Sequence, residues 1–141
     1  MLLSQTAEYA LRAVVFLAGH PQEPQTTKKI AQATGVPGGY LAKILQTLGR
    51  AGFVHSQRGL GGGFTLARQP QDLSVLDIIN AVDTFARIKQ CPMGLEGHGP
   101  HLCHLHRKLD DALASIEKTF RSTSVQELIE HADDIPSTCH P

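Results

Sequence analysis

The chain has 141 residues, of which 41% are apolar and 18% charged, a composition that fits one folded domain or two small lobes sharing a core and excludes a disordered chain. Its formal net charge of zero divides into +5 over residues 1–70, with seven Lys or Arg against two acidic residues, and −5 over residues 71–141, with six against eleven. A basic half is the expected sign of a polyanion contact, although charges on an ordinary solvated face can be distributed in the same way.

No apolar run approaches the roughly 20 residues that a membrane span needs. The N-terminus also lacks the basic start and small-residue cleavage site of a signal peptide. We therefore expect a cytoplasmic protein with no membrane partner. In that compartment the three cysteines are expected to be thiols or metal ligands rather than a disulfide framework.

The first 52 residues have the pattern of three helices. Residues 4–20 show a helical apolar stripe behind a capping serine, Ser4. A second helix is predicted over 26–35, between threonine caps and Gly35, and a third over 39–52. Because the short turn "VPGGY" joins the last two, the sequence predicts a helix-turn-helix.

The stretch "QRGLGGGFTL" follows these helices, and its glycines admit two interpretations. A phosphate-binding P-loop would need a preceding strand, a Lys-Ser/Thr at its end and a helix after it, and the last two are missing. Residues 53–57 and 63–68 instead alternate like two strands around Gly59 to Gly63, which predicts a β-hairpin wing. A helix-turn-helix with a basic wing indicates a nucleic-acid reader whose second helix enters the major groove.

The second half of the chain is predicted to alternate between helices and irregular segments. A helix capped by Ser74 is expected over 74–85, and a loop rich in Gly and Pro over 86–101. Residues 102–123 form a long apolar stripe at helical spacing, which a symmetric partner helix would cover. A short helix over 124–134 completes the pattern, before a tail.

Three segments of this chain resemble the Rrf2 family of bacterial winged-helix repressors: "LAKILQTLGRAGFVHSQRGLGGGFTLAR", "EYALRAVVFLA" and "SVLDIINAVD". The resemblance implies a mainly α fold with a small β-wing and a homodimer that binds a double-stranded DNA operator. It divides the chain into a winged helix-turn-helix domain (1–85), a cluster or metal-binding loop (86–101), a long dimerisation helix with a short C-terminal helix (102–134) and a flexible tail (135–141). Nothing in the sequence supports catalysis, so an enzyme is not expected.

Within this arrangement we expect particular residues to contact DNA. Threonines and nearby amides at the start of the first helix of the motif would contact phosphate. Residues at the start of the second helix would face the major groove, and the wing would reach the backbone or minor groove. The expected set is Thr26, Thr27, Lys28, Gly38, Gly39, Tyr40, Lys43, Arg58 and Gly59. The alternative for Tyr40 is packing within the protein, and the alternative for Lys43 is neutralisation of phosphate without base contact.

Many family members carry three loop cysteines that bind an iron–sulfur cluster, separated by about five residues each, and other members lack the cluster. This chain keeps the outer two places, Cys91 and Cys103, with eleven residues between them and no cysteine near Gly97. Its third cysteine, Cys139, lies in the tail. The loop is instead rich in histidine, at positions 98, 101, 104 and 106. Plain thiols, an oxidation-sensing pair or a solvated polar loop are the alternatives to a metal site.

Cys103 and His106 are three residues apart on the first turn of a predicted helix, so they share a face that suits two ligands of one metal. Some members use non-cysteine ligands, including an acid from the partner's first helix, and Glu8 occupies the matching position. The expected ligands of a [2Fe–2S] cluster are therefore Cys91, Cys103 and His106, completed by Glu8 or His98. The same set would suit Zn²⁺, and a regulator without metal, switched by thiol oxidation or a partner protein, is the other alternative.

Overall fold

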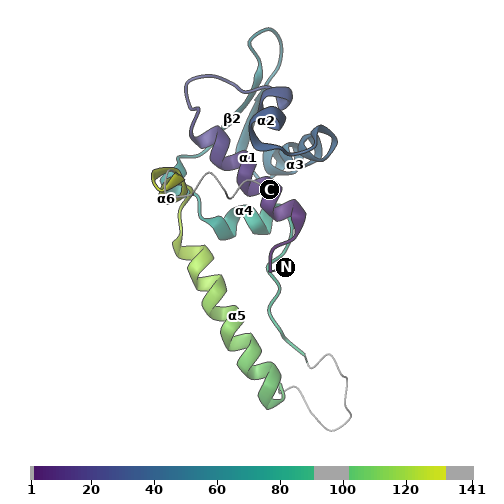
Figure 1. Ribbon diagram of the computed structural model, residues 1–141, viewed down its shortest axis with the longest axis vertical. Coiled ribbons are helices and arrows are strands. Elements are labelled where there is room, and N and C mark those ends of the chain that lie inside the picture. Colours follow the sequence, from purple (N-terminus) through teal and green to yellow (C-terminus); the bar gives the residue numbers. More distant parts are fainter. Residues whose placement is uncertain (1, 91–101, 133–141) are drawn as a thin grey trace.

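The computed structural model describes residues 2–90 and 102–132, and their arrangement is shown in Figure 1. The elements in chain order are α1 (Gln5–Ala18), α2 (Thr27–Thr34), α3 (Gly38–Arg50), β1 (Val54–Gln57), β2 (Gly63–Leu66), the 3-10 helix η1 (Pro70–Asp72), α4 (Val75–Val82), α5 (His104–Ser122) and α6 (Val125–Glu130). We call α1 to α4 with the β-hairpin the N-terminal lobe. The lobe gathers at one end of the molecule, and α5 extends from it as a long rod (Figure 1). The predicted fold class is confirmed.

Side-chain caps set where the helices of the lobe begin. Ser4, Thr26 and Ser74 are the N-caps of α1, α2 and α4, and each side-chain oxygen accepts the backbone N–H three residues on, at 3.0 to 3.2 Å. Asp77 completes a capping box by accepting the Ser74 N–H at 3.0 Å. Gly35 ends α2 with a left-handed φ of 73°. These caps confirm the starts and the stop that the sequence predicts.

Two helices are shorter than their patterns predict. The sequence predicts a helix over 124–134, but α6 ends at Glu130. Apolar periodicity favours a helix over 74–85, but α4 ends at Val82 and Asp83 is already extended. The Asn80 side chain accepts the backbone N–H of Phe85 at 3.0 Å. Because a local side chain takes a donor that another helical turn would use, the chain leaves the helix early. The other helices of the lobe begin and end within about two residues of the predicted ranges.

The glycine-rich stretch forms the predicted hairpin, and a third segment pairs with it. β1 and β2 are antiparallel, with Val54 opposite Leu66. From outside the hairpin, the Gln25 N–H donates to the Phe64 carbonyl at 2.9 Å, and the Phe64 N–H donates to the Gln25 carbonyl at 2.8 Å. Since Gln25 directly precedes the N-cap of α2, these two hydrogen bonds tie the wing to the start of the helix-turn-helix.

The core of the lobe is aliphatic, as the absence of Trp predicts. α1 lies against α2, α3, α4, α6 and β2, so it is the central helix of the lobe. The largest fully buried side chains come from the helices and the segments that join them: Val14, Leu17, Ile30, Val36, Leu41, Leu45, Leu48, Leu73, Ile78 and Val125. The α2–α3 pair is therefore held rigidly on α1, with its outer face free for a partner.

α5 is held to the lobe at one end and open to solvent at the other. Near its C-terminal end Phe120 meets Phe85 edge-on, with ring centroids 5.6 Å apart. α6 then turns back, and Val125 lies fully buried in the core of the lobe. Toward the N-terminal end of α5, Leu105 and Leu109 are 62% and 45% exposed. Among residues 2–90 and 102–132, no helix combines the length and apolar character needed to cross a membrane.

Candidate nucleic-acid interface and metal-ligand pair

The start of α2 presents polar groups at the surface. The Thr26 hydroxyl is engaged as the N-cap, accepting the Lys29 N–H at 3.2 Å. Thr27 is half-buried, and Lys28 is exposed beside it. The first N–H groups of a helix lack intrahelical acceptors and carry partial positive charge, so they suit a phosphate. Thr26, Thr27 and Lys28 thus lie together at a helix end of the right chemistry, and their contact with DNA stays a prediction.

The start of α3 is open at its N-terminus. Its N-cap residue, Pro37, makes no side-chain cap hydrogen bond. Gly38 and Gly39 follow, both exposed, and a Cβ added to either would meet no atom within 4 Å. A phosphate or a base edge can therefore approach the backbone closely here. The two glycines give the second helix of the motif an unobstructed tip.

Tyr40 and Lys43 extend this surface along α3. Tyr40 is 58% exposed, but its ring also lies against Tyr9 of α1, with centroids 6.2 Å apart at 58°. Arg12 covers the Tyr9 ring at 5.8 Å from its centroid. Tyr40 thus packs on one side while more than half of it stays free for DNA. Lys43 is exposed one turn further along the helix.

The wing brings a basic residue to the end of the lobe. Arg58 and Gly59 are exposed where the hairpin leaves β1, and Gly59 has a φ of 97° that a side chain would strain. Gln25, which lies in a loop before α2, pairs with Phe64 of β2. Only Gly63 hints at that pairing, because a Cβ there would lie 2.6 Å from the Gln25 carbonyl atoms. The wing is therefore built by a contact that local sequence does not reveal.

The structure brings Cys103 and His106 together at the start of α5. Cys103 is the N-cap residue, and its sulfur accepts the His106 N–H at 3.5 Å. Its Sγ lies 3.1 Å from the Nδ1 of His106, and both side chains are partly buried. This is a hydrogen-bond distance. Since a thiolate and an imidazole bind a metal at about 2.3 and 2.0 Å, two such ligands of a tetrahedral ion lie about 3.5 Å apart, so a small shift of these side chains would let both bind one metal ion. The predicted proximity of the pair is confirmed, and its role as ligands stays a prediction.

Glu8 is the one other expected ligand that the structure describes, and it does not lie with this pair. Cys91 and His98 lie outside the described residues. Glu8 is on the first turn of α1 and partly buried. Within residues 2–90 and 102–132 no three His, Cys, Asp or Glu side chains form a group that could hold a metal. Glu8 of the same chain therefore does not join Cys103 and His106.

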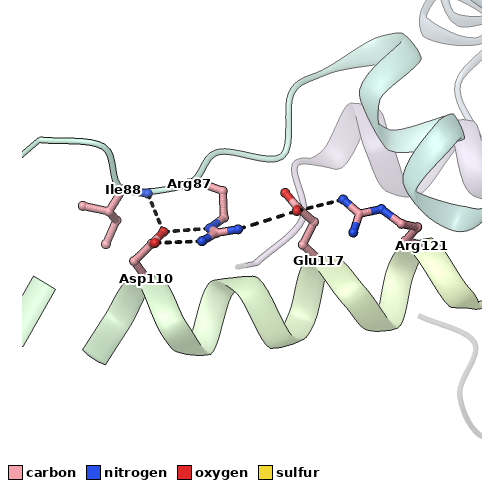
Figure 2. Close-up of polar contacts among 5 residues, drawn as sticks. All are labelled: Arg87, Ile88, Asp110, Glu117 and Arg121. Atoms are coloured by element: carbon pink, nitrogen blue, oxygen red, sulfur yellow. Dashed lines mark hydrogen bonds and ion pairs between the residues drawn. The ribbon is translucent and has the colours of Figure 1, made fainter. Parts of the chain in front are cut away.

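An ion-pair network holds the segment before residue 91 on α5 (Figure 2). Arg87 donates from Nε and Nη2 to the two oxygens of Asp110, at 2.7 and 2.8 Å. Asp110 also accepts the Ile88 N–H at 3.0 Å. Glu117 lies 3.6 Å from Arg87 and accepts from Arg121 at 3.0 Å. The start of the predicted 86–101 loop is thus held against the helix by a bidentate pair.

This network shifts the titration of its members. The hydrogen bond from Arg87 lowers the pKa of the Asp110 carboxyl, and the bond from the Ile88 N–H acts in the same direction. The same contact with Asp110 raises the pKa of the Arg87 guanidinium. Both side chains remain partly exposed, at 32% for Arg87 and 19% for Asp110. The pair is therefore charged at neutral pH and lies near water.

Comparison with known proteins adds to this geometry. The Rrf2 family model, described as an iron-dependent transcriptional regulator, matches residues 3–131. The chain is 32% identical over 135 residues to the HTH-type transcriptional regulator IscR of Xenorhabdus nematophila, covering 94% of this chain and 82% of that protein. It is 28% identical over 139 residues to the regulator NsrR of Bacillus subtilis, covering 96% and 94%.

Two solved structures have the same fold over almost the whole chain. IscR of T. potens superposes with a TM-score of 0.79 at 27% identity, covering 95% of this chain and 90% of that one. CymR of B. subtilis, described as the global cysteine regulator, gives a TM-score of 0.78 at 26% identity, covering 93% and 98%. The chain belongs to the Rrf2 family and is a DNA-binding transcriptional regulator of the winged-helix type, not an enzyme.

Proposed function

We propose that this regulator binds a two-fold symmetric DNA operator as a homodimer, and that a [2Fe–2S] cluster at the N-terminal end of α5 sets its affinity. The observation that carries the proposal is the Cys103–His106 pair, with sulfur and imidazole nitrogen 3.1 Å apart at the start of a helix. The exposed part of the apolar stripe begins at the same end of α5, so the proposed ligand site and dimer contact lie side by side.

For the DNA contact, each lobe would place the start of α3 in the major groove. Gly38 and Gly39 leave room for the backbone, and Tyr40 and Lys43 reach outward from the next turn. The α2 terminus around Thr26 would bind a neighbouring phosphate. The exposed Arg58 of the wing would reach the DNA backbone or the minor groove. Arg68 is also exposed, but its guanidinium lies over the Phe53 ring, 5.0 Å from the centroid.

For the homodimer, α5 supplies the contact. Leu105 and Leu109 are large apolar side chains that this chain leaves exposed on a helix of 19 residues. A two-fold axis would bring the same stripe of a second chain against them and bury both. Two lobes held in this way would meet two half-sites of a palindromic operator.

For the cluster, Cys91, Cys103 and His106 would be ligands, with Glu8 or His98 completing the set. Their chemistry fits the group, because thiolates and imidazoles both bind the irons of [2Fe–2S] centres. The bound cluster would supply a one-electron redox couple and a centre that oxidants or nitric oxide can attack. The chain's own contribution would be to hold Cys103 and His106 on a helix start and to hold the segment before residue 91 through Arg87. The iron-dependent description of the family supports this proposal.

A metal-independent or zinc-binding regulator is the second candidate. The similarity to CymR, described as a global cysteine regulator, favours it as much as the similarity to IscR favours the cluster. The two cysteines with a histidine would equally suit a Zn²⁺ site. The two candidates differ in colour and in metal content.

The test is purification without air, followed by visible absorption and metal analysis. We expect a brown protein with iron and sulfide in equal amounts, and a colourless protein with stoichiometric zinc would contradict the cluster. Cys91→Ser and Cys103→Ser should each abolish the chromophore, while Cys139→Ser should leave it intact. Serine at position 103 remains a good helix cap, so loss of colour in that variant would report a lost ligand rather than a frayed α5.

The role of Glu8 is tested by mixing two variants. If Glu8 binds the cluster of the partner chain, a heterodimer of Glu8→Ala and Cys91→Ser chains has one site that lacks both ligands and one that keeps all of them. We expect the mixture to regain a wild-type spectrum at about one site per heterodimer, as two-fold symmetry requires. If verified heterodimers show only the sum of the two mutant spectra, Glu8 is not a ligand across the interface.

A further inference from the structure

Leu60 stands at the tip of the wing, and its side chain is wholly exposed, at 107% of the reference value. We propose that Leu60 inserts into the minor groove of the operator and contacts its apolar sugar walls, so that the wing reads groove shape as well as charge. This inference rests on the proposed DNA contact of the wing and adds a residue to it. Figure 1 shows the hairpin projecting from the end of the lobe opposite to the free end of α5.

The tip is a defined turn that presents Leu60 outward. The Gly62 N–H donates to the Gly59 carbonyl at 3.0 Å, which closes a four-residue β-turn. Gly61 has a φ of 74°, whereas Leu60 has no positive φ. This combination is that of a type II turn with Leu60 at its second position. The side chain therefore projects from a hydrogen-bonded turn.

The glycines around Leu60 make the tip narrow. A Cβ added to Gly62 would lie 2.3 Å from the Gln57 carbonyl oxygen and 2.8 Å from that of Gly59. Gly59 and Gly61 have no side chain to widen the turn on either side of Leu60. The minor groove of B-DNA is only about 6 Å wide, so a tip that carries one side chain between glycines fits it better than a bulky loop would.

The surroundings of Leu60 favour DNA over another protein as its partner. The neighbours of Leu60 along the chain are glycines and the exposed Arg58, so it does not belong to an apolar patch of the size that protein interfaces use. Arg58 lies two residues away and can hold the tip at the phosphates. Proteins that bind the minor groove commonly combine basic side chains with an inserted apolar side chain such as leucine.

The proposal predicts a specific loss when Leu60 becomes polar. Leu60→Ser should weaken operator binding about tenfold, or ~1.4 kcal/mol, because partial burial of a leucine is lost. Leu60→Met keeps an apolar side chain of similar size and should bind like wild type. The salt dependence of both variants should match wild type, since no charge changes. Their melting temperatures should also be unchanged, because the Leu60 side chain is wholly exposed.

The experiment uses the full chain and a duplex that the wild-type protein selects from a random-sequence library. Affinity is measured by fluorescence anisotropy for wild type, Leu60→Ser and Leu60→Met. The chain has no Trp, so Leu60→Trp adds a single indole whose quenching by acrylamide reports burial of the tip. We expect quenching to fall several-fold when the duplex is added. Gln71→Trp, at an exposed position of η1, is the matched control and should not change.

Each outcome decides the proposal. Equal affinity of Leu60→Ser and wild type overturns it, as does an indole at position 60 that stays accessible in the complex. An indole already protected in the free protein would mean that the tip contacts a second chain, which also overturns it. If the wild-type protein selects no duplex, the DNA contact itself fails and both proposals fall together. Weakened Leu60→Ser with a protected indole supports insertion into DNA.

Discussion

Gly63→Ala tests how the wing is joined to the helix-turn-helix. Gly63 has a φ of 148°, and a Cβ there would lie 2.6 Å from the carbonyl carbon and oxygen of Gln25 and 3.0 Å from its nitrogen. These are backbone atoms, so no side chain can move aside to make room. The substitution must displace Gln25 from β2 and break its two hydrogen bonds with Phe64.

The size of the effect follows from these contacts. Two backbone hydrogen bonds contribute about 1 kcal/mol each, and a residue held in a disfavoured backbone region adds about 1 to 2 kcal/mol of strain. We therefore expect a loss of about 3 kcal/mol in the free energy of unfolding. For a chain of this size that corresponds to a fall of roughly 10 °C in melting temperature.

The assay is thermal unfolding followed by circular dichroism, with all variants at one protein concentration because association would shift the melting temperature. Gly39→Ala is the matched control, since its Cβ would meet nothing within 4 Å and it lies inside α3. Alanine is favoured over glycine in a helix by about 0.5 to 1 kcal/mol, so this control should melt at or slightly above wild type. If Gly63→Ala melts within about 2 °C of wild type, the pairing of Gln25 with β2 does not hold the wing.

Three further predictions concern charge. Operator affinity should fall steeply with salt, because several Lys and Arg side chains would displace counterions, and a flat dependence would contradict the assigned DNA surface. Arg58→Ala should weaken binding about tenfold and reduce the slope of log affinity against log salt by about one, without lowering the melting temperature; unchanged affinity would remove the wing contact. The pKa of Asp110 is lowered in the fold, chiefly by Arg87, so the stability this pair adds is present above the unfolded value of about 3.9 and is lost as pH falls through the folded value. Asp110→Asn should therefore reduce the acid dependence of unfolding by up to about one proton, and a profile identical to that of wild type below pH 5 would contradict the pairing.

The helices and the proximity of Cys103 and His106 could be predicted because their causes are local. Ser4, Thr26 and Ser74 are residue types that favour the N-cap position of a helix, and each side chain accepts the backbone N–H three residues later. Cys103 and His106 are three residues apart, a spacing that brings their side chains together at any helix start. Such signals need no knowledge of the rest of the fold.

Other features depend on contacts between distant residues and could not be predicted. Gln25 pairs with Phe64 across 38 intervening residues, and nothing near Gln25 resembles a strand. The sequence shows that Arg87 and Asp110 are charged, but not that they pair. They are 23 positions apart, and either residue has other residues of opposite charge nearer in the sequence. The early end of α4 was missed for a different reason. The apolar pattern continues past Val82, and it gave no sign that the Asn80 side chain would accept the Phe85 N–H.

These distant contacts connect the proposed ligand site with the lobe that carries the helix-turn-helix. Cys103 and His106 lie at the N-terminal end of α5, and Asp110 of the same helix, seven residues after Cys103, holds Arg87 and Ile88. Phe85 packs on Phe120 further along, so the segment after α4 runs beside α5 for much of its length. We therefore expect a rotation of α5 to move this segment, and with it α4 and the lobe that presents α3. Val125, directly after α5, is buried in the same lobe, so α5 is joined to the lobe both at its C-terminal end and through the 85–88 segment. In the proposed dimer we therefore expect a change at Cys103 and His106 to alter the spacing of the two recognition helices without unfolding either lobe.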